Sequence, residues 1–122
     1  MTSPNLVLLY VEDPARSAQF YERLFGRPSV AAFPTYAAFT FDYGLHLGLW
    51  STSARDFVSG GAGHRSELAF MVDDDREVRR LYEAWKALGV PFEQAPMTAV
   101  FGLTFVALDP DGHRLRVCTP DD

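Results

Sequence analysis

The feature that most constrains the fold of this 122-residue chain is an internal repeat. The segments LVLLYVEDPARSAQFYERLFG, from Leu6, and LAFMVDDDREVRRLYEAWKALG, from Leu68, both run from an apolar stretch through acidic residues into an amphipathic stretch. Equivalent positions are 61 residues apart, half the chain, in three pairs: Val11 and Val72, Asp13 and Asp74, and Tyr21 and Tyr82. Such a fixed spacing indicates the duplication of one supersecondary unit.

Each copy predicts a strand followed by a helix. In the first copy, Asp13 is a favourable N-cap and Pro14 suits the first helical position. Apolar residues then recur at steps of three and four until Gly26, a residue suited to end a helix. The second copy has an Asp-rich N-cap and the stop signals Gly89 and Pro91.

Three short segments rich in β-forming residues follow each helix: PSVAAF, YAAFTF and LHLGLW, then PFEQA, LTFVAL and HRLRVC. The chain therefore predicts an α+β fold, a single domain over residues 1–122 built of two βαβββ repeats, about 4–50 and 65–119. One helix covers only one face of each four-stranded sheet. We expect the helix-free faces to curve around a cleft, within one chain or between the two chains of a homodimer.

The residues between the repeats, 51–66, are small, polar and rich in glycine (STSARDFVSGGAGHRS). This composition is typical of a flexible connector. Two interpretations stay open: a plain linker, or a lid over the cleft.

Alternation along LHLGLW predicts that Trp50 lies on the helix-free face of the first sheet. His46 and Gly48 share that face, because side chains two residues apart in a strand point the same way. Gly48 would leave room there for the ring of a ligand. The helix side is expected to hold Leu45, Leu47 and Leu49.

The last strand places two arginines on one face of the second sheet. After the Asp-Pro-Asp-Gly turn of VALDPDGHRLRVC, Leu115 and Val117 point one way, and Arg114, Arg116 and Cys118 point the other. Because Arg114 is nearer the turn, we expect it to reach solvent.

Composition excludes several classes of function. A formal net charge of -5 and the absence of a Lys/Arg run argue against a nucleic-acid partner. The longest apolar runs are about a third of the roughly 20 residues that a membrane span requires, and we expect neither a span nor a leader.

The single cysteine, Cys118, cannot form an internal disulfide, which favours a cytoplasmic location. No motif places a serine or cysteine beside an activating base, so no catalytic residue is predicted.

Duplicated βαβββ units, VED before SAQFYERLFG, and the terminal DPDGHRLRV together resemble the vicinal oxygen chelate superfamily of glyoxalase, bleomycin-resistance and extradiol dioxygenase proteins. The resemblance covers essentially the whole chain. It implies metal ligands at three positions, which this chain fills with Leu6, Glu67 and Arg116. An aliphatic chain and a guanidinium offer no lone pair to a metal ion, so we expect no metal and no other cofactor. The resemblance also implies that Tyr10 faces the cleft.

The stretches NLVLLYVEDPARSAQFYERLFGRPSV, LWS, RSEL and VFGLTFVALDPDGHRLRVC are similar to one branch of that superfamily, the phenazine-antibiotic (griseoluteate) resistance proteins. This closer resemblance implies sequestration of a flat aromatic compound. The ligand contacts that it implies are Trp50, Ser66, Glu67, Phe101, Gly102 and Arg116. The superfamily resemblance adds Tyr10, and the strand pattern adds three further candidates: Phe33, Tyr36 and His46.

Three functions remain as alternatives. The favoured hypothesis is a metal-independent, homodimeric protein that sequesters a planar aromatic compound, phenazine-like or bleomycin-like, with Arg116 contacting an anionic ligand, pairing with Glu67, or both. The second is a metal-dependent lyase, isomerase or dioxygenase with displaced ligands such as His46 and Glu67. The third is an interaction module with a vestigial cleft.

Overall fold

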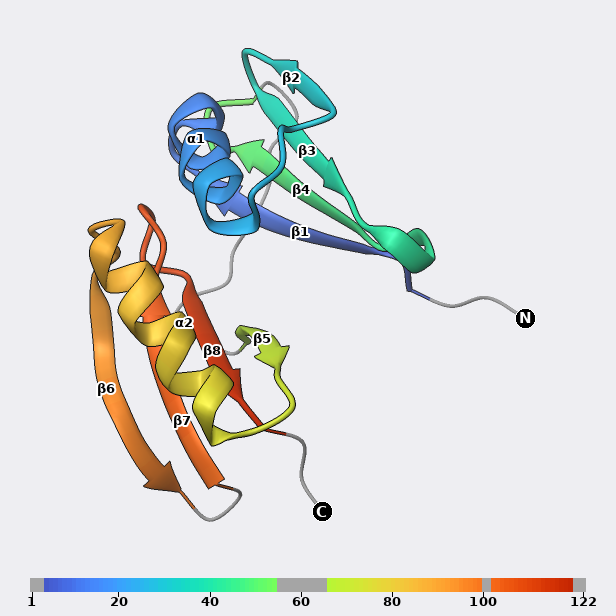
Figure 1. Cartoon of the computed structure of the whole chain (residues 1–122). Helices are drawn as coiled ribbons and strands as arrows, with labels where there is room; N and C mark the ends of the chain where they lie inside the picture. The colour runs from blue at the N-terminus through green and yellow to red at the C-terminus, as the bar shows by residue number, and fades with distance from the viewer. Residues whose placement is uncertain (1–3, 55–65, 100–101, 120–122) are drawn as a thin grey trace. The chain divides into compact units, whose positions relative to one another are not determined.

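The computed structural model describes residues 4–54, 66–99 and 102–119, which form two compact units, Met1–Gly61 and Ala62–Asp122. Within the described residues each unit has the order strand, α-helix, three strands, and Figure 1 labels these elements. The predicted α+β class, with two repeated βαβββ modules and mixed sheets, is confirmed. No helix in these described ranges is long and apolar enough to cross a membrane.

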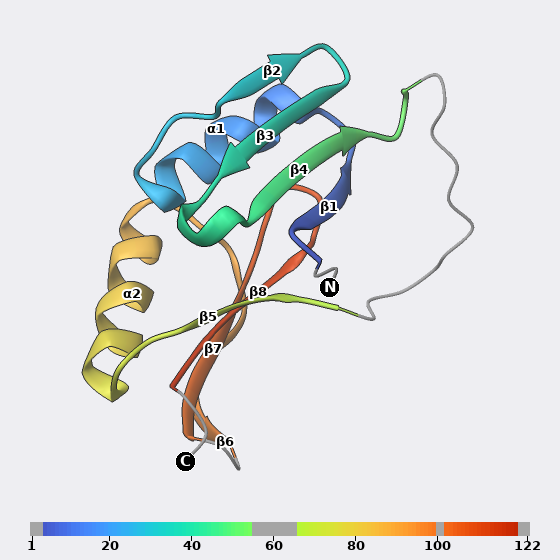
Figure 2. The same ribbon diagram turned by 90° about the vertical axis from the view of Figure 1, so that its right-hand side faces the viewer.

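The first unit is a four-stranded mixed sheet with one helix. Its elements are β1 (Leu6–Val11), α1 (Pro14–Phe25), β2 (Ala31–Phe33), β3 (Tyr36–Thr40), the 3-10 turn η1 (Asp42–Gly44) and β4 (His46–Ser51). The strand order is β1-β4-β3-β2, with β1 parallel to β4 and the other pairs antiparallel. Figure 2 shows α1 lying behind the strands of this sheet, along one face.

The second unit repeats this topology. Its elements are β5 (Leu68–Met71), α2 (Asp75–Ala87), β6 (Phe92–Ala99), β7 (Gly102–Leu108) and β8 (Arg114–Cys118). The strand order is β5-β8-β7-β6, with β5 parallel to β8 and the other pairs antiparallel. Both sheets therefore join their first and last strands in parallel at equivalent places.

The helix caps explain why the two copies fold alike. The carboxylate of Asp13 accepts hydrogen bonds from the backbone N–H groups of Ala15 and Arg16, at 3.1 and 3.4 Å. Asp74 accepts one from the N–H of Glu77 at 2.9 Å. Gly26 ends α1 in the left-handed conformation, with φ 68°, which costs a glycine no steric strain.

Each unit has its own core between helix and sheet. In the first, the buried Phe39 of β3 contacts the rings of Tyr21 and Phe25 from α1, with centroids 6.4 and 5.2 Å apart. In the second, the buried Phe105 of β7 lies against Trp85 of α2, with centroids 5.4 Å apart. Large buried rings on the helix side leave the opposite side of each sheet for function.

Two local expectations differ from the structure. Leu45 is exposed, because it lies between the η1 turn, which ends at Gly44, and β4, which begins at His46. The strand expected at PFEQA continues to Ala99, with register shifts against β7 between Phe92 and Gln94 and between Gln94 and Met97. A strand can pass such bulges without ending, although they break the alternation that sequence reasoning uses.

Candidate functional site

The helix-free side of the first sheet carries a group of aromatic side chains. The register pairs Trp50 of β4 with Tyr10 of β1 and with Tyr36 of β3, and pairs Tyr36 with Phe33 of β2. The alternate residues Leu47 and Leu49 are buried on the helix side. We call the exposed side, with Tyr10, Phe33, Tyr36 and Trp50, the aromatic face.

The rings of the aromatic face are accessible and partly in contact. Tyr10 is 42% exposed and Phe33 is 65% exposed. The Tyr10 and Trp50 rings meet edge to face, with centroids 6.2 Å apart and an interplanar angle of 63°. This geometry is favourable for aromatic pairs. The cross-strand rows bring together four of the predicted ligand residues, although the chain separates Tyr10 from Trp50 by two other strands.

His46 lies on the same side of the sheet as Trp50, as alternation predicted. Its Nδ1 atom is 3.1 Å from the hydroxyl oxygen of Thr40, its partner on β3. The hydroxyl and the imidazole give this end of the aromatic face hydrogen-bonding groups.

The helix-free side of the second sheet carries an ion pair. Nε of Arg116 on β8 donates a hydrogen bond to Oε1 of Glu67, the residue before β5, at 2.5 Å. Nη1 of Arg116 donates to the hydroxyl of Thr104 at 3.1 Å, and that hydroxyl donates to the carbonyl of Val117 at 2.8 Å. Thr104 is fully buried, so one of the two groups that hold the guanidinium is itself held in place within the sheet.

Arg114 reaches solvent in part, and it also makes ion pairs that the sequence did not predict. Its side chain is 28% exposed, with Nη1 3.5 Å from Oε2 of Glu67 and Nε 2.9 Å from Oε2 of Glu93. The Nε atom is buried and makes no hydrogen bond with a described residue, so the contact with Glu93 is an ion pair without hydrogen-bond geometry. The contact with Glu93 depends on strand order, because Glu93 on β6 lies beyond β7, within reach of a long arginine.

The three positions that would hold a metal ion do not fit one. Leu6 is aliphatic, Arg116 is a cation, and both carboxylate oxygens of Glu67 face guanidinium groups. Among the residues that the structure describes, no three His, Cys, Asp or Glu side chains gather closely enough to bind a metal. A divalent site needs several converging ligands with lone pairs, and this arrangement offers one occupied carboxylate.

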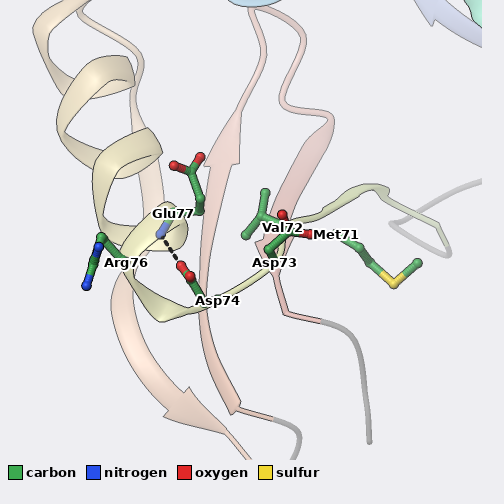
Figure 3. Close-up of a pocket in the computed structure, with 6 residues that line it drawn as sticks. All are labelled: Met71, Val72, Asp73, Asp74, Arg76 and Glu77. Atoms are coloured by element: carbon green, nitrogen blue, oxygen red, sulfur yellow. Dashed lines mark hydrogen bonds between the residues drawn. The ribbon is translucent and has the colours of Figure 1, made fainter.

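Figure 3 shows a hollow at the turn from β5 into α2, and none of the predicted site residues lines it. Two of its carboxylates already have partners. Asp74 caps the helix, and Glu77 bonds to Arg80, whose hydrogen bond lowers the pKa of Glu77. The residues lining the hollow are Met71, Val72, Asp73, Asp74, Arg76 and Glu77. Because Asp74 and Glu77 serve the start of α2 in this way, we do not treat the hollow as a ligand site.

The remaining predicted site residues lie at strand starts or outside the described chain. Ser66 is exposed, one residue before Glu67. Gly102 begins β7 with φ 126°, a conformation that favours glycine, and a Cβ there would meet the hydroxyl of Thr119 at 2.9 Å. Phe101 and residues 55–65, which form most of the connector, lie outside the described residues. As ligand contacts, all ten candidates stay predictions.

Comparisons with known proteins agree with this architecture. The profile of the Glyoxalase/Bleomycin resistance protein/Dioxygenase superfamily matches residues 3–117. The chain is 34% identical over 122 residues to the phenazine antibiotic resistance protein EhpR of Enterobacter agglomerans, covering 98% of this chain and 93% of that protein. A protein from Agrobacterium tumefaciens, solved by NMR, is 44% identical with a TM-score of 0.81, covering 98% of each chain. A superfamily protein from Burkholderia phytofirmans has the same fold, with 21% identity, a TM-score of 0.79, and coverage of 95% and 98%.

Proposed function

The chain belongs to the glyoxalase/bleomycin resistance protein/dioxygenase superfamily, and from that premise we propose that it binds a planar aromatic compound and holds it unchanged, without a metal ion. The proposed ligand class is the phenazine antibiotics, because the relative from Enterobacter agglomerans is named for resistance to them. In this function the protein protects by sequestration.

The aromatic face is the observation that carries the proposal. A planar ligand gains most from ring surfaces, and each well-placed ring contact adds about 0.5 to 1.5 kcal/mol beyond the burial of its area. Tyr10 and Trp50 already meet edge to face, and Tyr36 is the direct cross-strand neighbour of Trp50. A group of exposed aromatic rings on one face of a sheet is typical of a surface that binds a ligand or a partner. A bound planar ligand would cover these rings.

The ion pair of Glu67 and Arg116 supports a role without metal. The one carboxylate at the family's ligand positions is occupied by two guanidinium groups. Separating Arg116 from Glu67 would leave two partly buried charges without their closest partners, which is unfavourable. In the proposed function, Arg116 stays paired with Glu67 and also donates a hydrogen bond from an N–H group to a carboxylate or carbonyl of the ligand.

The proposal includes a homodimer in a cytoplasmic setting, with ligand clefts shared between the chains. Exposed apolar residues such as Leu6 and Leu8 would be covered in such an assembly. Sedimentation equilibrium of the full chain tests the dimer independently of ligand binding, and a monomer at high protein concentration would remove this part of the proposal.

The experiment that tests the function is calorimetric titration of EDTA-dialysed protein with phenazine. We expect saturable binding that is unchanged by added divalent metal. Trp50→Ala should weaken it about tenfold or more, because the variant loses both stacking and buried area. The matched control is Tyr43→Asn, which removes a fully exposed ring from the η1 turn, at a φ of 70° that asparagine tolerates.

Two outcomes would overturn the proposal. Binding that appears only when a divalent metal is added would favour the enzyme of the same superfamily. Equal losses of affinity in Trp50→Ala and Tyr43→Asn would remove the aromatic face from the binding site.

A further inference from the structure

Gly48 in the middle of β4 is glycine for reasons of space. Its φ is not among the positive values found in this chain, so another residue could adopt the same backbone conformation. Glycine in a strand interior weakens the strand and often marks the close approach of another group. Register places it between Leu8 of β1 and Ala38 of β3.

The group that approaches Gly48 is the ring of Tyr36. A Cβ added to Gly48 would lie 2.5 Å from the hydroxyl oxygen of Tyr36 and 3.0 Å from its Cε1 atom. It would also lie 2.7 Å from Cδ1 of Leu8, the end of a flexible side chain. The ring space predicted over Gly48 for a ligand is therefore occupied by a ring of the chain itself.

Tyr36 reaches this place by leaning along the sheet. Its direct partner on β4 is Trp50, whereas Gly48 is two residues earlier on that strand. Aromatic side chains can reach such diagonal neighbours. The lean carries the end of the Tyr36 ring from the cross-strand row of Trp50 into the next row, over Gly48.

We propose that Tyr36, seated over Gly48, is the floor on which the ligand stacks, and that Gly48 is a positioning residue that acts through it. This inference rests on the proposed function. Gly48 and Trp50 are two residues apart on β4, about 7 Å along the strand, so one ring can cover Tyr36 or Trp50, whereas fused rings can contact both. The site therefore selects extended, fused-ring aromatic compounds over single-ring ones.

The test measures the affinity of full-length protein for phenazine and for pyrazine, which is the central ring of phenazine alone. Wild type should bind phenazine at least tenfold more tightly than pyrazine. Gly48→Ala and Tyr36→Leu should each weaken phenazine binding about tenfold, whereas Tyr36→Phe should retain it, since the ring remains. Adding Gly48→Ala to Tyr36→Leu should cause no further loss, because the residue through which Gly48 acts is already gone.

A second measurement does not depend on ligand. The Hα protons of Gly48 should show an NMR ring-current shift in wild type and in Tyr36→Phe, and should lose it in Tyr36→Leu. Because Gly48→Ala could fold poorly, circular dichroism accompanies each variant, and Tyr36→Leu tests the floor without that risk.

The outcomes separate the inference from the proposed function. If wild type binds phenazine and Tyr36→Leu binds it equally well, the inference is wrong and the proposed function stands. The inference is also wrong, and the proposed function still stands, if Gly48→Ala weakens phenazine binding as much in the Tyr36→Leu background as in wild type. If wild type binds no phenazine, the proposed function fails, and the ligand role of Tyr36 fails with it, whatever the Gly48 shift shows.

Discussion

Glu67 and Arg116, 49 residues apart in sequence, form an ion pair in which Nε of the arginine lies 2.5 Å from Oε1 of the glutamate. Arg114 and Thr104 extend the pair into a network on the helix-free side of the second sheet. A carboxylate bound in this way is a structural partner of two cations, and its removal should be felt in stability.

Glu67→Gln should lower the free energy of unfolding by about 1 to 2 kcal/mol. The glutamate and Arg116 side chains are 27% and 19% exposed, so the cost should lie between that of exposed and fully buried pairs. Urea denaturation measures the change. The control is Glu77→Gln, which removes the more exposed pair with Arg80 and should change stability far less. An equal effect of both substitutions would refute the network's role.

The two N-caps should be energetically equivalent, since the repeat gives them the same task. Asp13→Ala and Asp74→Ala each leave backbone N–H groups of the first helical turn without their carboxylate partner. Each should cost about 1 kcal/mol in free energy of unfolding. Chemical denaturation of both variants checks this, with Asp13→Asn and Asp74→Asn expected to recover most of the loss. A neutral effect of either alanine would mean that its cap contributes nothing.

Glu77 should titrate below its ordinary pKa of 4.5, because the hydrogen bond from Arg80 favours the carboxylate. A lowered folded-state pKa contributes stability above the unfolded value, and this contribution is lost as the pH falls through the folded pKa. NMR titration of the Glu77 side chain measures the shift. In Arg80→Gln the pKa should return toward 4.5, and an unchanged value would contradict the assignment.

Tryptophan fluorescence should distinguish the aromatic face from the core. Trp85 is 4% exposed and contacts Phe70 and Phe105, whereas Trp50 lies on the helix-free side. Trp50→Phe should therefore emit at shorter wavelength than wild type and resist quenching by acrylamide. A red-shifted, easily quenched Trp50→Phe protein would mean that the solvent-accessible indole is Trp85.

The sequence predicted most where local rules decide. Asp13 and Asp74 cap their helices as expected, and alternation assigned Trp50 and His46 to the correct face, because both follow from neighbouring residues. The pairing of Glu67 with Arg116, one of two open interpretations, is found in the structure. Whether Arg116 also contacts a ligand stays a prediction.

The contacts that the sequence did not predict run across strands. Arg114 on β8 reaches Glu93 on β6 because only one strand, β7, lies between them, and the periodicity of the sequence does not reveal this order. The lean of Tyr36 over Gly48 likewise depends on the β3–β4 register. Both contacts depend on packing between distant segments, so they become visible only once the strand order is known.

Native mass spectrometry of metal-free protein incubated with phenazine tests whether the chain binds the ligand unchanged and without a metal. We expect a complex with one ligand per chain, no bound metal, and a released ligand of unchanged mass. The proposed function is wrong if no complex forms, if the complex needs a divalent ion, or if the released compound has an altered mass.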